Sequence, residues 1–126
     1  MSYAQRHAVA VTANTGGIGT GYTPVVTGAV SQIRYVADAT APYENTADFT
    51  ITVEATGEAV WSASDVAANT TVAPRQSTHN TAGTEALYAA SGVPVLAPIL
   101  VAHDRIKIEI AEAGNTTTGT FHVVIG

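Results

Sequence analysis

The sequence predicts an all-β protein folded as a single domain over residues 1–126. Val and Ile together number 23, whereas Leu and Met together number 4. Thr adds 19 more β-branched side chains, and these stiff residues fit a pleated strand better than a helix. Several segments also alternate apolar and polar residues, the pattern of a strand with one buried face. Turn residues between them favour an antiparallel β-sandwich or a jelly-roll-like small barrel with long loops.

Short alternating or β-branched segments mark the expected strands. In chain order they lie at residues 7–13, 31–37, 48–55, 59–62, 104–112 and 120–125. In the clearest of them Ile106, Ile108 and Ile110 alternate with charged residues, so the three isoleucines should face the core. Glycine-containing segments at 56–58 and 114–119 separate neighbouring strands and are typical of hairpin turns.

The remaining segments predict longer loops and one irregular strand. Residues 14–21 and 64–92 contain few large apolar side chains and are expected to be loops, with one short helical turn at 84–90. We interpret residues 1–30 as an extended N-terminal arm and loop. Two prolines in the apolar segment 93–101 fit an edge strand or an extended packing segment. A long loop in a small domain is more often functional or bound to a partner than idle.

Charge and composition exclude several classes of function. Charged residues make up only 12% of the chain, and five basic residues against ten acidic ones leave a net charge of −5. Binding to nucleic acid or to an anionic membrane relies on clustered Lys and Arg, so neither partner is expected. The chain has no Cys, which removes thiolate catalysis and zinc sites built on cysteine.

No local motif predicts catalysis, a cofactor or a metal ion. None of the six serines lies in a G-x-S-x-G sequence, and the four histidines form neither an H-x-H nor an H-E-x-x-H pattern. The glycine-rich segment 15–21 lacks the G-x-G-x-x-G spacing of a nucleotide-binding loop. We therefore expect a protein without enzymatic activity, cofactor or bound metal.

Tyrosine and arginine side chains in the expected loops and near the N-terminus are the candidate interface residues. They are Tyr3, Arg6, Tyr22, Tyr43 and Tyr88. Residues of these types often anchor a protein partner. The tyrosines fit two alternatives as well, capping the ends of the sandwich or forming an aromatic platform for a glycan. In addition, the backbone of residues 2–7 could add a strand to a neighbouring chain.

Part of the chain resembles a known class of proteins. The residues that carry the resemblance are Ala73-Pro74-Arg75, His79-Asn80-Thr81-Ala82-Gly83, Asp104-Arg105-Ile106-Lys107-Ile108-Glu109-Ile110, Gly114-Asn115 and Thr118-Gly119-Thr120-Phe121-His122-Val123. In pattern they are similar to small all-β virion proteins of tailed bacteriophages. Such proteins are encoded among the head genes and often decorate or cement the capsid. The family brings no catalytic residues with it.

The resemblance implies a non-enzymatic structural protein of the virion. The expected role is that of a decoration or cement protein on the capsid surface, where it binds the major capsid protein and stabilises its lattice. A homotrimer is expected, because a closed ring matches the three-fold points of such a shell. Two alternatives stay open: a tail, baseplate or fibre component of the phage, and a carbohydrate-binding module that helps it adhere to cells.

Overall fold

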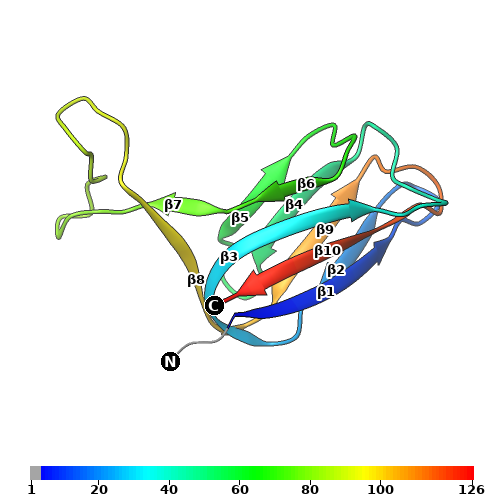
Figure 1. Cartoon of the computed structure of the whole chain (residues 1–126), viewed down its shortest axis with the longest axis horizontal. Coiled ribbons are helices and arrows are strands. Elements are labelled where there is room, and N and C mark those ends of the chain that lie inside the picture. Colours follow the sequence, from blue (N-terminus) through cyan, green and yellow to red (C-terminus); the bar gives the residue numbers. More distant parts are fainter. Residues whose placement is uncertain (1–3) are drawn as a thin grey trace.

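The computed structural model describes residues 4–126, which form two antiparallel β-sheets and no helix (Figure 1). Sheet A contains β1 (Gln5–Thr12), β3 (Val26–Ala37), β6 (Thr70–Val72), β7 (Arg75–Ser77), β8 (Leu96–Asp104) and β10 (Thr118–Ile125). Sheet B contains β2 (Gly19–Tyr22), β4 (Asp48–Val53), β5 (Ala59–Ala63) and β9 (Ile106–Ala111). The prediction of an all-β fold is confirmed.

The two sheets form a sandwich and do not close into a barrel. Sheet A has the strand order β1-β10-β3-β8-β7, with β6 also paired to β3, and sheet B has the order β2-β9-β4-β5. Within the described residues, β4 with β5 and β7 with β8 are the only paired strands that follow each other in the chain. Of the two architectures left open by the sequence, the sandwich is therefore the correct one.

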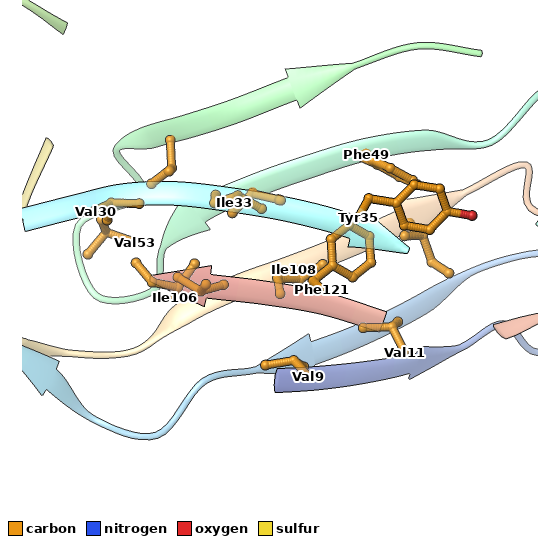
Figure 2. Packing of buried hydrophobic residues seen from close by; sticks show 14 of the residues in the cluster. Val9, Val11, Val30, Ile33, Tyr35, Phe49, Val53, Ile106, Ile108 and Phe121 are labelled. Atoms are coloured by element: carbon orange, nitrogen blue, oxygen red, sulfur yellow. The ribbon is translucent and has the colours of Figure 1, made fainter. Parts of the chain in front are cut away.

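Alternation along the strands builds the core between the sheets, as the period of two predicts (Figure 2). From sheet B, Ile106, Ile108 and Ile110 are almost completely buried. From sheet A, Phe121 and Val123 belong to the same buried cluster. Burying a large apolar side chain contributes about 1.5–3 kcal/mol to the free energy of unfolding, so this cluster is the main source of stability.

Phe49 lies at the centre of an aromatic cluster. Its ring centroid is 4.8 Å from that of Tyr35, 4.9 Å from Phe121, 5.7 Å from Trp61 and 6.0 Å from Tyr43. All four pairs meet edge to face, an arrangement that the charge distribution of aromatic rings favours. Because Phe49 comes from sheet B and Phe121 from sheet A, the cluster joins the two layers.

Tyr43 enters this cluster from the loop between β3 and β4. Its hydroxyl donates a hydrogen bond to the backbone carbonyl of Val11, and its ring stacks on that of Tyr35 with 5.6 Å between centroids. Burial and the neighbouring Tyr35 raise the pKa of Tyr43, and burial likewise raises the pKa of Tyr35. Both phenols therefore stay neutral in the folded protein at a pH where an exposed tyrosine already ionises.

The N-terminal part of the chain is not an extended arm and loop, contrary to the sequence prediction. Residues 5–12 pair with β10, residues 19–22 pair with β9, and Val26 begins the longest strand of sheet A. The last three residues of the expected strand-adding segment, 5–7, are therefore already part of a ladder with β10. Residues 1–3 lie outside the described residues.

Close packing explains why the end of the glycine-rich segment 14–21 forms part of strand β2. A Cβ atom at Gly19 would lie 2.7 Å from the carbonyl oxygen of Thr12, and one at Gly21 would lie 2.7 Å from Cγ2 of Val11. Such distances are far below van der Waals contact, so glycine is required where β2 passes close to β1. The sequence signal that indicated flexibility thus reflects a close approach of two backbones.

The structure also tests the predictions for the other segments that connect the strands. Segment 114–119 is not a hairpin, because β9 and β10 lie in different sheets and the segment crosses between them. Residues 84–90 form no helical turn, and the expected loop 64–92 contains the short strands β6 and β7. The hairpin at 56–58 is confirmed, because β4 and β5 pair on either side of it.

Candidate functional site

A projecting segment, residues 75–98, extends from one end of the sandwich and is called the arm below (Figure 1). It starts with β7 and ends with the first part of β8, which are paired from Arg75↔Pro98 to Ser77↔Leu96. Residues 78–95 form its tip. No residue from 75 to 98 is buried, so the arm contributes nothing to the core.

The arm leaves the sandwich because two strands share one edge of β3. Strand β8 pairs with β3 from Ile99↔Val30 to Asp104↔Val26, and β6 takes the next stretch of that edge at residues 33–35. Residues 96–98 consequently run past the sheet and pair with β7 instead. Each part of β8 thus has one free edge in the described chain, a setting in which proline is tolerated.

Hydrogen bonds within the arm fold its tip back on itself. The amide of Thr78 donates to the carbonyl of Val95 (2.8 Å), and the amide of Val95 donates to the carbonyl of Ala86 (2.9 Å). The amide of Ala86 donates in turn to the carbonyl of Thr78 (2.9 Å). The hydroxyl of Ser77 donates to the carboxylate of Glu85. These bonds give the arm a defined shape without help from the sandwich.

Exposed apolar side chains gather on the arm and on the strand that continues from it. Their exposed fractions are 40% for Leu87, 74% for Tyr88, 67% for Val93, 53% for Leu96 and 70% for Leu100. All three leucines of the chain are in this set. A monomeric protein seldom exposes so many large apolar residues in one region, and such regions usually contact another molecule.

Two of the predicted interface residues lie at the surface away from the arm. Arg6 lies on the outer face of sheet A, where it faces solvent. Tyr22 ends β2 in sheet B and is 40% exposed, with the guanidinium carbon of Arg105 4.1 Å from its ring centroid. Tyr88, by contrast, is on the arm. The surface candidates thus belong to three different parts of the molecule.

The prediction for Tyr43 as an interface residue is wrong, because its side chain is only 5% exposed and belongs to the core. Its place in a loop gave no sign of this burial, which depends on the distant residues Val11 and Tyr35. Tyr3 lies outside the described residues, so its predicted role has no structural counterpart here.

Sequence reasoning missed the other exposed apolar residues of the arm and of the strand that continues from it. They are Leu87, Val93, Leu96 and Leu100, which lie in the predicted loop and the predicted irregular strand. One signal could have found them: a chain with three leucines has all of them between positions 87 and 100.

The described residues 4–126 contain no group of three or more His, Asp or Glu side chains placed to hold a metal ion. The same part of the chain has no helix of the length and hydropathy that crossing a membrane requires. Among residues 4–126, the exposed tyrosines Tyr22 and Tyr88 lie on separate elements and do not form a shared aromatic surface.

Comparison with known proteins identifies no relative of this chain. No protein-family model matches it, no curated protein is significantly similar in sequence, and no solved structure matches its fold.

Proposed function

We propose that this chain is a non-enzymatic structural protein of a tailed-bacteriophage virion. Within that class its most specific role is that of a decoration or cement protein, which binds the outside of the head and stabilises the lattice of the major capsid protein. The observation that carries the proposal is the arm, which has no buried residue and bears several exposed apolar side chains. These side chains leave water only when a second protein covers them.

The binding free energy expected from such an attachment suits a shell in which the same contact is repeated many times. Covering Leu96 and Leu100 contributes about 1.5–3 kcal/mol for each side chain that is fully buried. A contact of this modest size stabilises a lattice when one particle repeats it many times. Nucleic acid and membrane are not partners in this proposal, because the net charge of −5 repels polyphosphates and anionic lipids.

The proposal includes a homotrimer, whose closed ring matches a three-fold point of the shell. Light scattering of the purified full chain should give three times the mass of the 12.9 kDa chain. A monomer mass at every concentration would contradict the trimer and leave the virion role open to its own test.

Immunogold labelling of particles from the phage that encodes the chain tests the virion role. Gold on the head is the expected result. Gold on the tail would contradict a decoration protein and support the tail, baseplate or fibre alternative, whereas particles without gold would contradict a virion protein altogether. A glycan array tests the carbohydrate-binding alternative, and the proposal expects no bound glycan.

A variant without the tip of the arm tests whether the arm makes the contact with the particle. Replacing residues 78–95 by Asn-Gly removes the tip, and a two-residue turn of this type suits a hairpin between the paired residues Ser77 and Leu96. Purified particles lacking the chain should co-sediment with the added full chain and not with the shortened one. Equal co-sedimentation of both proteins would contradict the role given to the arm.

A further inference from the structure

A basic hollow lies on the outer face of sheet A, away from the core and from the arm. It has a volume of about 190 Å³ and is lined by Arg6, Gln32, Arg34, Val36, His122 and Val124. Figure 1 shows the three contributing strands β1, β10 and β3 side by side, with no other element across this face. The hollow is therefore open to a partner from the solvent side.

The strand register brings its polar side chains together. Arg6 pairs with Val124, and Val124 pairs in turn with Gln32 on the neighbouring strand. One row further along the sheet, His122 pairs with Arg34. The intervening positions of β10 are buried in the core, so alternation turns these side chains outward. The hollow is thus a fixed feature of two strand ladders and not of a loop.

The basic groups of the hollow have no acidic partner among residues 4–126. Arg34 donates a hydrogen bond of 2.6 Å to the hydroxyl of Thr71, and neither Arg34 nor Arg6 forms an ion pair with a described residue. Nδ1 of His122 is buried and has no hydrogen-bond partner in the same part of the chain. Leaving such an atom unpaired is unfavourable, and a polar ligand that pairs with it offsets this cost.

Charge is divided unequally between the sheets. The strands of sheet A hold three arginines and a single acidic residue, Asp104, whereas the rest of the chain holds two basic and nine acidic residues. Those two basic residues form ion pairs, Arg105 with Glu54 and Lys107 with Glu109. The hydrogen bond that Lys107 donates to the carboxylate of Glu109 raises the pKa of Lys107 and holds its charge in place. Positive charge without an acidic partner in the described chain is therefore confined to sheet A.

We propose that the basic hollow binds carboxylate side chains on an acidic segment of a partner protein. Guanidinium groups bind the planar carboxylate through paired hydrogen bonds, and the amide of Gln32 adds a further donor. A nucleic acid fits less well, because the chain as a whole is acidic and no aromatic side chain lines the hollow to stack on a base. The inference rests on the proposed function for the partner, and it adds a second point of attachment besides the arm.

Nuclear magnetic resonance titration of the full chain with a hexaglutamate peptide tests the inference. Saturable shifts are expected at residues of β1, β10 and β3 that line the hollow. Arg34→Glu should weaken binding at least about ten-fold, because it removes a bidentate donor and adds repulsion. Arg75→Glu changes the net charge equally but lies on β7, outside the hollow, and should weaken binding no more than about two-fold.

Four results would overturn the inference. They are an absence of shifts at the hollow, equal weakening by both variants, equal shifts with inorganic phosphate, and self-association of the chain that Arg34→Glu abolishes. The last result would make a second copy the occupant. Arg34→Gln, which keeps a similar size and removes the charge, serves if Arg34→Glu loses its fold by circular dichroism.

The experiments distinguish a failure of this inference from a failure of the proposed function. Peptide binding at the hollow together with particles that carry no gold would contradict the virion role and leave the carboxylate site standing. Gold on the head without peptide binding would contradict the carboxylate site and leave the virion role standing.

Discussion

The sandwich and the arm use the same kind of side chain in opposite ways. In the sandwich, apolar residues such as Phe49 and Ile106 are almost fully buried and belong to one core cluster. In the arm, Tyr88 and Val93 are 74% and 67% exposed, and internal hydrogen bonds maintain the shape instead. The hydrophobic free energy of the sandwich is therefore released on folding, whereas the apolar side chains of the arm stay in water after folding, and the proposed function has them buried on binding.

This difference separates stability from function within one chain. A substitution in the sandwich should lower the free energy of unfolding, because it removes buried contacts. A substitution on the arm should leave that free energy nearly unchanged and weaken attachment to a partner. Paired variants, one from each region, test this separation directly.

The largest contrast is expected between Phe49→Ala and Tyr88→Ala. Phe49 is 1% exposed at the centre of the aromatic cluster, so its loss should lower the free energy of unfolding by about 3–5 kcal/mol. Tyr88 is 74% exposed, and its loss should change that free energy by less than about 0.5 kcal/mol. Urea denaturation of both variants measures the contrast, and similar losses in the two would contradict it.

A second contrast uses two adjacent residues on opposite faces of β8. Ile99 is 2% exposed and Leu100 is 70% exposed. Ile99→Ala should cost about 2–5 kcal/mol of unfolding free energy, whereas Leu100→Ala should cost less than about 0.5 kcal/mol. Leu100→Ala should nevertheless weaken co-sedimentation with particles. A Leu100→Ala variant that loses stability like Ile99→Ala would show that Leu100 packs within the folded chain.

Alkaline pH should weaken the sandwich through its buried tyrosines. The pKa values of Tyr43 and Tyr35 are raised from 10.0 in the folded protein, so the unfolded chain loses these protons first. The free energy of unfolding should therefore be flat below about pH 10 and fall above it, by up to about 1.4 kcal/mol per pH unit for each tyrosine. Denaturation curves between pH 8 and pH 11 measure the decline.

Tyr43→Phe is the control for this pH dependence. At neutral pH it should cost about 1 kcal/mol, because the carbonyl of Val11 loses the hydrogen bond from the hydroxyl. Above pH 10 its decline should be shallower than that of the parent, since one titrating group is gone. An equal slope in both proteins would mean that Tyr43 does not cause the decline.

The strands of the core could be predicted from sequence because their signal is local. Ile106, Ile108 and Ile110 alternate with polar residues, and that pattern alone determines which face is buried. The strand partners could not be predicted in the same way. The glycine and asparagine residues at 114–119 suit a hairpin as well as a crossing between sheets, and the choice depends on distant strands.

The candidate site was predictable only in part for a related reason. Tyr88 was singled out because aromatic residues in loops are common interface anchors; it is exposed on the arm, and its role as an anchor stays a prediction. Tyr43 has the same local signature, yet contacts with Val11 and Tyr35 bury it. The hollow around Arg6 and Arg34 required the strand register, which places residues far apart in the sequence in neighbouring rows.

The most direct test of the account is the unfolding free energy of the chain with residues 78–95 replaced by Asn-Gly. We expect one cooperative transition with a free energy within about 1 kcal/mol of the parent, because the lost arm contacts and the shorter loop nearly cancel. A loss of more than about 3 kcal/mol, as large as that of a core truncation, would contradict the claim that the arm stands outside the folding core.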